Sequence, residues 1–222
     1  RIYAAGMVVT AGFIIGFDNE TNSVSEAMVD CIKATSIPVC MIGLLAALPN
    51  TQLTRRLQKD GRLFRDYEIV NANQGCQSTI GLNFCTLRPR RDIIEDYQRV
   101  LQSVYDPAAY FERVRAVGRA LNCLDVRRRL HFKKSELLQL ARVVWHMGIR
   151  TPGLRRHFWG AFVDCAWHNP GAVDQVIRLM ALYLHLGRFS LYVIGELNSL
   201  TTRIDAGELN VPPSIIPLSA VG

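Results

Sequence analysis

Residues 7–61 alternate continuous apolar runs with amphipathic segments, and this order restricts the possible folds more than any other feature of the chain. The runs MVVTAGFIIG (residues 7–16) and PVCMIGLLAA (residues 38–47) are typical of strands buried on both faces of a parallel sheet. Apolar residues at helical spacing follow each run, at residues 24–32 and 53–57. Strand, helix, strand and helix with short connections predict βαβ units and a parallel sheet.

Local signals place the ends of these elements. Ser23 and Glu26 have the spacing of a capping box at the start of the first helix. Pro49, Asn50 and Thr51 turn the chain into the second helix, which Gly61 is expected to end. The segment 65–81 is rich in Asn, Gln and Gly, as a functional lid or a mobile loop would be, and residues 80–86 are expected to form a short third strand.

From residue 91 onward the pattern is helical only. Asp106 with Pro107, Ser135, Thr151 with Pro152, and Asn169 with Pro170 each mark the start of a helix, and a last helix is predicted from Arg188 to about Arg203. The residues expected to face inward on the first four of these helices are Ile93, Tyr97, Val100, Leu101, Val104, Tyr110, Phe111, Val114, Val117, Leu121, Leu138, Ala141, Trp145, Leu154, Phe158, Phe162 and Cys165. We expect Gly148 to close the helix that Ser135 starts.

The fold class predicted is therefore α/β followed by all-α. A (β/α)₈ barrel needs about eight strands, and the two or three strands expected here would leave bare edges if they stood alone. The apolar run also begins within a few positions of Arg1, so we expect a cut through a larger fold whose other strands lie upstream. We predict the last two or three βα units of a partial TIM-like barrel in residues 1–90, a helical bundle in residues 91–204 and a disordered tail in residues 205–222.

Composition permits an anionic partner without requiring one. The net charge is +7, and basic residues cluster between Arg113 and Lys134, although a solvated helical face explains such a cluster more often than a ligand site does. The six cysteines form no CxxC or CxxxCxxC motif and the five histidines have no ligand spacing, so we predict no metal site in this chain. Unpaired, reduced thiols are expected, with a cytoplasmic location.

The segment Gly12–Glu20 (GFIIGFDNE) carries the strongest functional signal. It is a strand that ends in glycines and acids, and ligands of parallel α/β folds bind at that end of the strands. Asp18 and Glu20 could accept hydrogen bonds from a ribose or an amino group. Alternatively, Asp18 shapes the turn and Glu20 is solvated.

Gly12, Ile14, Gly16 and Glu20 match the GxIxGxxxE pattern on the fifth barrel strand of radical S-adenosylmethionine enzymes, which the chain resembles. Residues 37–63 resemble the sixth strand with its "LPGTxL…RL…GRL" turn and helix, where Asn50 replaces the usual glycine and tolerates a left-handed backbone. Residues 81–114 (GLNFCTLRPRRDIIEDYQRVLQSVYDPAAYFERV) resemble the segment that follows the barrel in cobalamin-binding members of the family. The remaining helices, to about residue 203, resemble the helical domain of unknown function at the C-terminus of those proteins.

The resemblance implies a C-terminal portion of a cobalamin-dependent radical S-adenosylmethionine enzyme, with C-methyl transfer or related radical chemistry. One wall of the S-adenosylmethionine pocket is then expected here, from Gly12, Ile14, Gly16, Asp18 and Glu20 and, by position, Leu44, Leu45 and Pro49. Packing in the barrel core accounts equally well for the last apolar residues. The [4Fe–4S] cluster and cobalamin are expected only in the full-length protein, with the missing N-terminal regions as partners, and the chain alone is expected to be inactive. Asn83 and Arg88 are candidates for contact with the substrate, a small molecule or lipid, or with cobalamin.

Two other classes of function remain open. The basic helical half, with Trp145, Trp159 and Trp167, is compatible with a non-catalytic module that binds an anionic membrane, RNA or a protein, although aromatic residues at helical spacing are more often core and no RNA-binding motif is present. Nucleic acid is therefore not the favoured partner, whereas peripheral membrane contact stays open. The third class is a self-sufficient protein whose helical tail scaffolds an oligomer.

Overall fold

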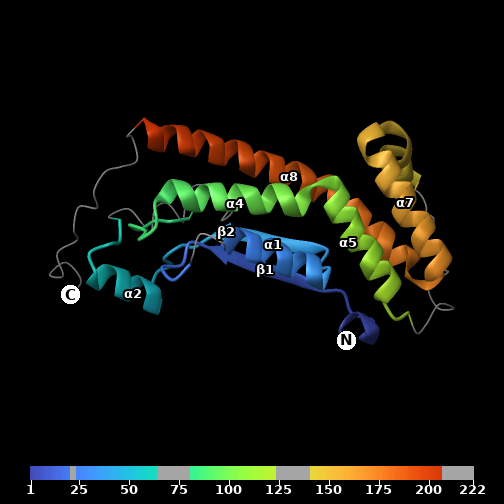
Figure 1. Ribbon diagram of the computed structural model, residues 1–222, viewed down its shortest axis with the longest axis horizontal. Coiled ribbons are helices and arrows are strands. Elements are labelled where there is room, and N and C mark those ends of the chain that lie inside the picture. Colours follow the sequence, from blue (N-terminus) through green and yellow to red (C-terminus); the bar gives the residue numbers. More distant parts are fainter. Residues whose placement is uncertain (21–23, 65–80, 124–140, 207–222) are drawn as a thin grey trace. The chain divides into compact units, whose positions relative to one another are not determined.

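The computed structural model describes residues 1–20, 24–64, 81–123 and 141–206 (Figure 1). Over these ranges the chain is mostly helical, with one two-stranded parallel sheet. The elements in chain order are a 3-10 helix (Tyr3–Ala5), β1 (Thr10–Ile15), α1 (Val24–Thr35), β2 (Val39–Leu44), α2 (Gln52–Lys59), α4 (Arg90–Tyr105), α5 (Pro107–Ala120), the π-helix η3 (Val144–Arg150), α7 (Pro152–His168), a 3-10 helix (Pro170–Ala172) and α8 (Val173–Asp205).

Contacts divide the chain into two units, each assembled from several stretches. The first unit comprises Arg1–Ala11, Val29–Cys40 and Gln102–Ser190, and the second comprises Gly12–Met28, Met41–Leu101 and Leu191–Gly222. Both units therefore contain part of the N-terminal α/β segment together with later helices. The predicted domain boundaries at residues 90 and 204 stay predictions, and the predicted disordered tail lies outside the described residues from 207 onward.

The two predicted strands form within the apolar runs, but the prediction that both faces of each strand are buried is wrong. Ile15 and Ile42 are buried, whereas Ile14 and Met41 are 50% and 67% exposed. The buried face of β2 meets α4, where the Tyr97 hydroxyl donates to the Ile42 carbonyl at 2.8 Å. Among the described residues nothing equivalent covers the other face, so alternate side chains of each strand remain open to solvent.

The turn into α2 follows the sequence prediction closely. Asn50 adopts a left-handed backbone with φ of 63°, and Gly61 does so with φ of 65° after the helix ends. Thr51 caps the helix through its hydroxyl, which accepts from the Thr54 amide. Leu57 is completely buried, as predicted. The capping residue predicted for α1, Ser23, lies outside the described residues.

The prediction of a third strand at residues 80–86 is wrong for residues 81–86, the part that the structure describes. There the chain makes only an isolated antiparallel bridge between Leu63 and Phe84. Leu82 has φ of 56°, which interrupts an extended backbone. Its amide instead donates to the Leu45 carbonyl at 2.7 Å, beside the end of β2.

The first unit has an aromatic core around α5. Asp106 caps the helix by accepting from the Ala109 amide, and Pro107 follows it, as the sequence predicts. The Tyr110 hydroxyl donates to the Leu179 carbonyl at 2.7 Å, and the Tyr183 hydroxyl donates to the Tyr105 carbonyl at 3.1 Å. Burial raises the pKa of Tyr183 to about 12, so its hydroxyl remains a proton donor at neutral pH.

The separate last helix predicted from Arg188 is wrong, because α8 continues without a break to Asp205 (Figure 1). Gly187 lies inside the helix, where a Cβ would meet the Tyr183 ring at 3.0 Å. The aromatic ring thus occupies the space that the glycine leaves. Within the described part of the chain, the helical stretch 170–202, which is the short 3-10 helix and most of α8, is long and apolar enough to cross a membrane, a criterion that core helices also meet.

The inward orientation predicted for Trp145 is also wrong, because the residue is 60% exposed. The prediction assumed α-helical spacing, whereas residues 144–150 form a π-helix with more residues per turn. Gly148 does not close this helix, which continues to Arg150. Ala141 is exposed rather than inward-facing, and Ser135 and Leu138 lie outside the described residues.

Gly118 of α5 provides a test of packing in the first unit. A Cβ at this position would lie 2.8 Å from Val176 Cγ2 and 3.3 Å from Cys165 Sγ. We expect Gly118→Ala to lower the free energy of unfolding by about 1–3 kcal/mol, since the side chain overpacks a closed contact. Thermal unfolding measures the change.

Gly160→Ala is the matched control. Gly160 lies on α7 with nothing within 4 Å of its Cβ position, so the same substitution should raise stability by up to about 1 kcal/mol through helix propensity alone. Equal effects at both glycines would contradict the packing interpretation.

Candidate functional site

The candidate site is the turn that ends β1 in the second unit. Gly16 has φ of 115°, and a Cβ there would lie 2.8 Å from Leu82 Cδ2. Glycine therefore satisfies both the backbone conformation and the close approach of a neighbouring side chain. The Gly16 amide donates to both carboxylate oxygens of Glu20, at 3.0 and 2.9 Å. The acid at the end of the GxIxGxxxE segment thus folds back onto the last glycine of that segment.

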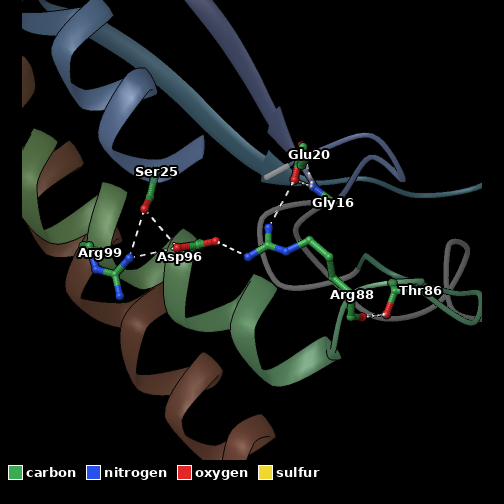
Figure 2. Close-up of polar contacts among 7 residues, drawn as sticks. All are labelled: Gly16, Glu20, Ser25, Thr86, Arg88, Asp96 and Arg99. Carbon is green, nitrogen blue, oxygen red and sulfur yellow. Dashed lines mark hydrogen bonds and ion pairs between the residues drawn. The ribbon is translucent and has the colours of Figure 1, made fainter. Parts of the chain in front are cut away.

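A polar network connects this turn to α4 (Figure 2). Arg88 Nη1 lies 3.9 Å from Glu20 Oε2, and Arg88 Nη2 donates to Asp96 Oδ2 at 2.7 Å. The other oxygen of Asp96 accepts from Ser25 Oγ and from Arg99 Nη1, both at 2.9 Å. Two acidic and two basic side chains therefore alternate from β1 to α4, and the network also reaches the start of α1.

Arg88 has donor capacity left within this network. Its side chain is only 13% exposed. Its Nε and Nη1 atoms are buried and make no hydrogen bond to any residue that the structure describes. Nη1 therefore interacts with Glu20 by charge at 3.9 Å rather than by a hydrogen bond.

Asp18 is held by two arginines. Arg62 donates to both carboxylate oxygens, at 2.8 and 2.7 Å, and Arg56 approaches at 3.3 Å from an exposed position. Hydrogen bonds from the Arg62 guanidinium hold the pKa of Asp18 below its ordinary value. Arg62 also donates to the Cys85 carbonyl at 2.7 Å, so Asp18 fastens the turn after β1 to two other loops of the unit.

The predicted residues that follow β2 have different surroundings. Leu44 and Leu45 are buried, and the Leu45 amide donates to the Ile15 carbonyl at 2.8 Å, at the edge where β1 ends. Pro49 is exposed in the turn before α2. Asn83 is buried and its amide group pairs with the backbone of Ala47, with distances of 2.7 and 3.0 Å. Asn83 thus shapes the end of β2 in this chain.

Gly12 and Ile14 point to the open face of the sheet. Gly12 is exposed, and no atom lies within 4 Å of the place where its Cβ would be. The structure thus brings Gly16, Asp18, Glu20 and Leu45 to one edge of the sheet. It places Gly12 and Ile14 farther back along β1. Among the described residues, no group of three or more His, Cys, Asp or Glu side chains has the arrangement to hold a metal ion.

Sequence reasoning missed Ser25, Asp96 and Arg99. Asp96 and Arg99 are three residues apart on α4, a spacing that permits an ion pair on any helix and does not reveal burial. Ser25 is 71 positions from Asp96 in the chain, so only the packing of α1 against α4 brings their side chains together.

The family described as a domain of unknown function, DUF4070, matches residues 51–199. The chain belongs to the DUF4070 family. Two curated relatives extend the match to the N-terminal side. An uncharacterized methyltransferase of Synechocystis sp. is 34% identical over 184 residues, which are 82% of this chain and 33% of that protein. A hopanoid C-2 methylase of Rhodopseudomonas palustris is 28% identical over 192 residues, 83% of this chain and 34% of that protein.

This DUF4070 chain therefore spans about one third of the length of both relatives. No solved structure matches it. The family match begins at Thr51, the cap of α2, and covers the described helices up to Ser199 in α8. The Gly16 turn lies before the residues that the family model matches.

Arg88→Met should disrupt the network of the DUF4070 chain. Asp96 and Glu20 lose a shared cation while Asp96 remains buried, so we expect a loss of about 3 kcal/mol in the free energy of unfolding. Arg91→Met is the control, because Arg91 makes only exposed ion pairs with Glu95 and Asp205 and should have little effect. Chemical denaturation compares the two variants, and equal losses would show that the network contributes no more than a surface pair.

The Asp18–Arg62 pair predicts a dependence of stability on pH. Because the pKa of Asp18 is lowered in the folded protein, the pair stabilises the fold above the ordinary carboxyl pKa and loses this effect as pH falls through the folded value. Asp18→Asn should therefore lower the unfolding temperature at neutral pH, with the difference from the wild type shrinking below about pH 4.

Asp30→Asn is the control for this measurement, since Asp30 is an exposed acid of α1. It should change the unfolding temperature little at any pH. A difference between Asp18→Asn and the wild type that stays constant down to acid pH would rule out the ion pair as its source.

Proposed function

We propose that this chain is part of a cobalamin-dependent radical S-adenosylmethionine methyltransferase and that β1 provides one wall of the S-adenosylmethionine pocket. Membership of the DUF4070 family and two relatives named as a methyltransferase and a methylase support methyl transfer as the reaction type. The match of Gly12, Ile14, Gly16 and Glu20 to the GxIxGxxxE pattern supports the radical S-adenosylmethionine class.

The observation that carries the proposal is the open face of the sheet. In a (β/α) barrel, helices cover the outer face of the strands and alternate side chains point into the interior. Here α4 covers one face, while Gly12, Ile14 and Met41 lie on the other. We propose that β1 and β2 are two strands of such a barrel, and that the open face is its interior.

The residues present fit a planar ligand against β1. The absence of a side chain at Gly12 leaves free space on the open face, and Ile14 offers an apolar surface beside it. When bound, S-adenosylmethionine supplies the radical chemistry that the family resemblance implies. The chain's own contribution is to shape the wall. Glu20 fixes the Gly16 turn, and Asp18 fastens the loop that follows.

Leu44, Leu45 and Pro49 enter the proposed pocket by resemblance alone. Both leucines are already packed within the unit, with Gly81 against Leu44 and Gly16 against Leu45. Asn83 is likewise engaged by Ala47. We therefore propose Gly12 and Ile14 as the ligand-facing residues, with Leu44 and Leu45 as their support.

We do not assign the other two cofactors to binding sites in this chain. The sequence has no CxxxCxxC motif, and no described cluster could hold a metal ion. We propose that the [4Fe–4S] cluster and cobalamin are bound by other regions of a longer protein. The two relatives are about three times as long as the part that this chain matches. The chain alone would then be inactive. The substrate class we propose is a small molecule or lipid, methylated in the cytoplasm.

Gly12→Val in the full-length protein tests the proposed pocket. Valine suits a strand and meets no neighbour in the described chain, so the fold should be retained while the branched side chain fills the open face. We expect the dissociation constant for S-adenosylmethionine to rise at least about tenfold, or ~1.4 kcal/mol. Equilibrium dialysis with labelled S-adenosylmethionine measures it.

Thr10→Val is the matched control. Thr10 is exposed on the same face of β1, one alternate position farther from the carboxyl end of the strand. Its replacement should leave the affinity for S-adenosylmethionine almost unchanged. A folded Gly12→Val protein that binds S-adenosylmethionine as tightly as the wild type would refute the proposed wall.

A further inference from the structure

One face of α7 is apolar and open to solvent. Trp159, Val163 and Trp167 follow one another at intervals of four residues and are 39%, 60% and 84% exposed. The opposite side of the helix is its buried side, with Phe158, Ala161 and Cys165. One side of α7 therefore packs into the core of the first unit, whereas Val163 and Trp167 on the other side remain mostly exposed among the described residues.

The neighbouring π-helix η3 adds two more exposed apolar residues, Trp145 and Ile149. Trp159 Nε1 donates to the Gly148 carbonyl at 3.0 Å, and its ring packs edge-on against Phe158 at 5.3 Å between centroids. These contacts fasten η3 to α7. We name the exposed set the tryptophan face: Trp145, Ile149, Trp159, Val163 and Trp167.

The exposed arginines of η3 and α7 are not balanced by exposed acids in the same segment. Arg155 and Arg156 are exposed one helical turn before Trp159, and Arg150 is exposed at the end of η3. None of the three forms an ion pair with a described residue. Asp164 is the only acid in residues 141–168, and its largely buried side chain pairs with Arg115 and Arg119. No free carboxylate of this segment therefore offsets the arginines.

We propose that the tryptophan face docks the protein on an anionic lipid bilayer. Tryptophan side chains prefer the level of the lipid headgroups, and arginines beside them bind lipid phosphates. Ile149 and Val163 favour a bilayer over a nucleic acid, because aliphatic side chains give bases nothing on which to stack. This docking is independent of the proposed methyl transfer, since it can be measured without cofactor or substrate.

Sedimentation of the full-length protein with lipid vesicles tests the proposal. We expect binding to vesicles that contain phosphatidylglycerol, little binding to pure phosphatidylcholine, and release as salt is raised. Trp167→Ala should weaken binding about tenfold through lost apolar area. Arg150→Gln with Arg156→Gln should weaken it about fivefold for each arginine removed. Arg155 is left in place because it donates to the Ile149 carbonyl.

Leu191→Ala and Arg55→Gln are the matched controls, an exposed apolar residue of α8 and an exposed arginine of α2, and neither should change vesicle binding. The proposal is overturned if anionic vesicles are not bound, or if Trp167→Ala binds them as well as the wild type does. It is also overturned if the protein does not bind vesicles but binds RNA or self-associates, and Trp167→Ala abolishes that binding. The tryptophan face would then bind RNA or a second copy of the chain.

Discussion

The packing of the second unit depends on Arg88, whose guanidinium interacts with both Glu20 and Asp96. Glu20 is committed to the Gly16 amide, and Asp96 is buried and already accepts from Ser25. Without the guanidinium, two carboxylates would lie near one another in a region with little water, at a large cost in free energy. The turn after β1 is therefore fixed by an electrostatic requirement that involves residues from three separate stretches of the chain.

Helix α4 serves the sheet in two ways through adjacent residues. Tyr97 donates to the backbone of β2, which holds the helix against one face, and Asp96 anchors Arg88 at the edge of the sheet. The same helix therefore determines which strand face is covered and how the turn at its edge is shaped. Because α4 covers only one face of the sheet, the other face, with Gly12 and Ile14, stays open. This open face is where we propose the pocket.

In the first unit, the two sides of α7 have different surroundings. Close packing at Gly118 and the buried tyrosine hydroxyls hold α5, α7 and α8 together, and they use only one side of α7. Its other side carries Trp159, which is partly exposed and contacts η3 and Phe158, and Trp167, which is 84% exposed. Exposed apolar surface is unfavourable in water. Its occurrence in the same segment as arginines that form no ion pair with a described residue is the basis of the proposed docking on an anionic bilayer.

Sequence alone determined the features that depend on neighbouring residues: the caps at Thr51 and Asp106, the left-handed turn at Asn50, and the apolar faces of α4 and α5. These follow from local sterics and hydrogen bonding, so a short stretch of chain suffices. Only the tertiary structure decided that Trp145 points outward from a π-helix, that α8 runs through Gly187, and that Ser25 joins Asp96. The contact between Ser25 and Asp96 spans 71 positions in the chain, and η3 is bonded to Trp159 of the next helix, so neither arrangement can be read from a local pattern. At Gly187 the Tyr183 ring four residues earlier fills the space beside the glycine, a contact that a rule on glycine alone does not predict.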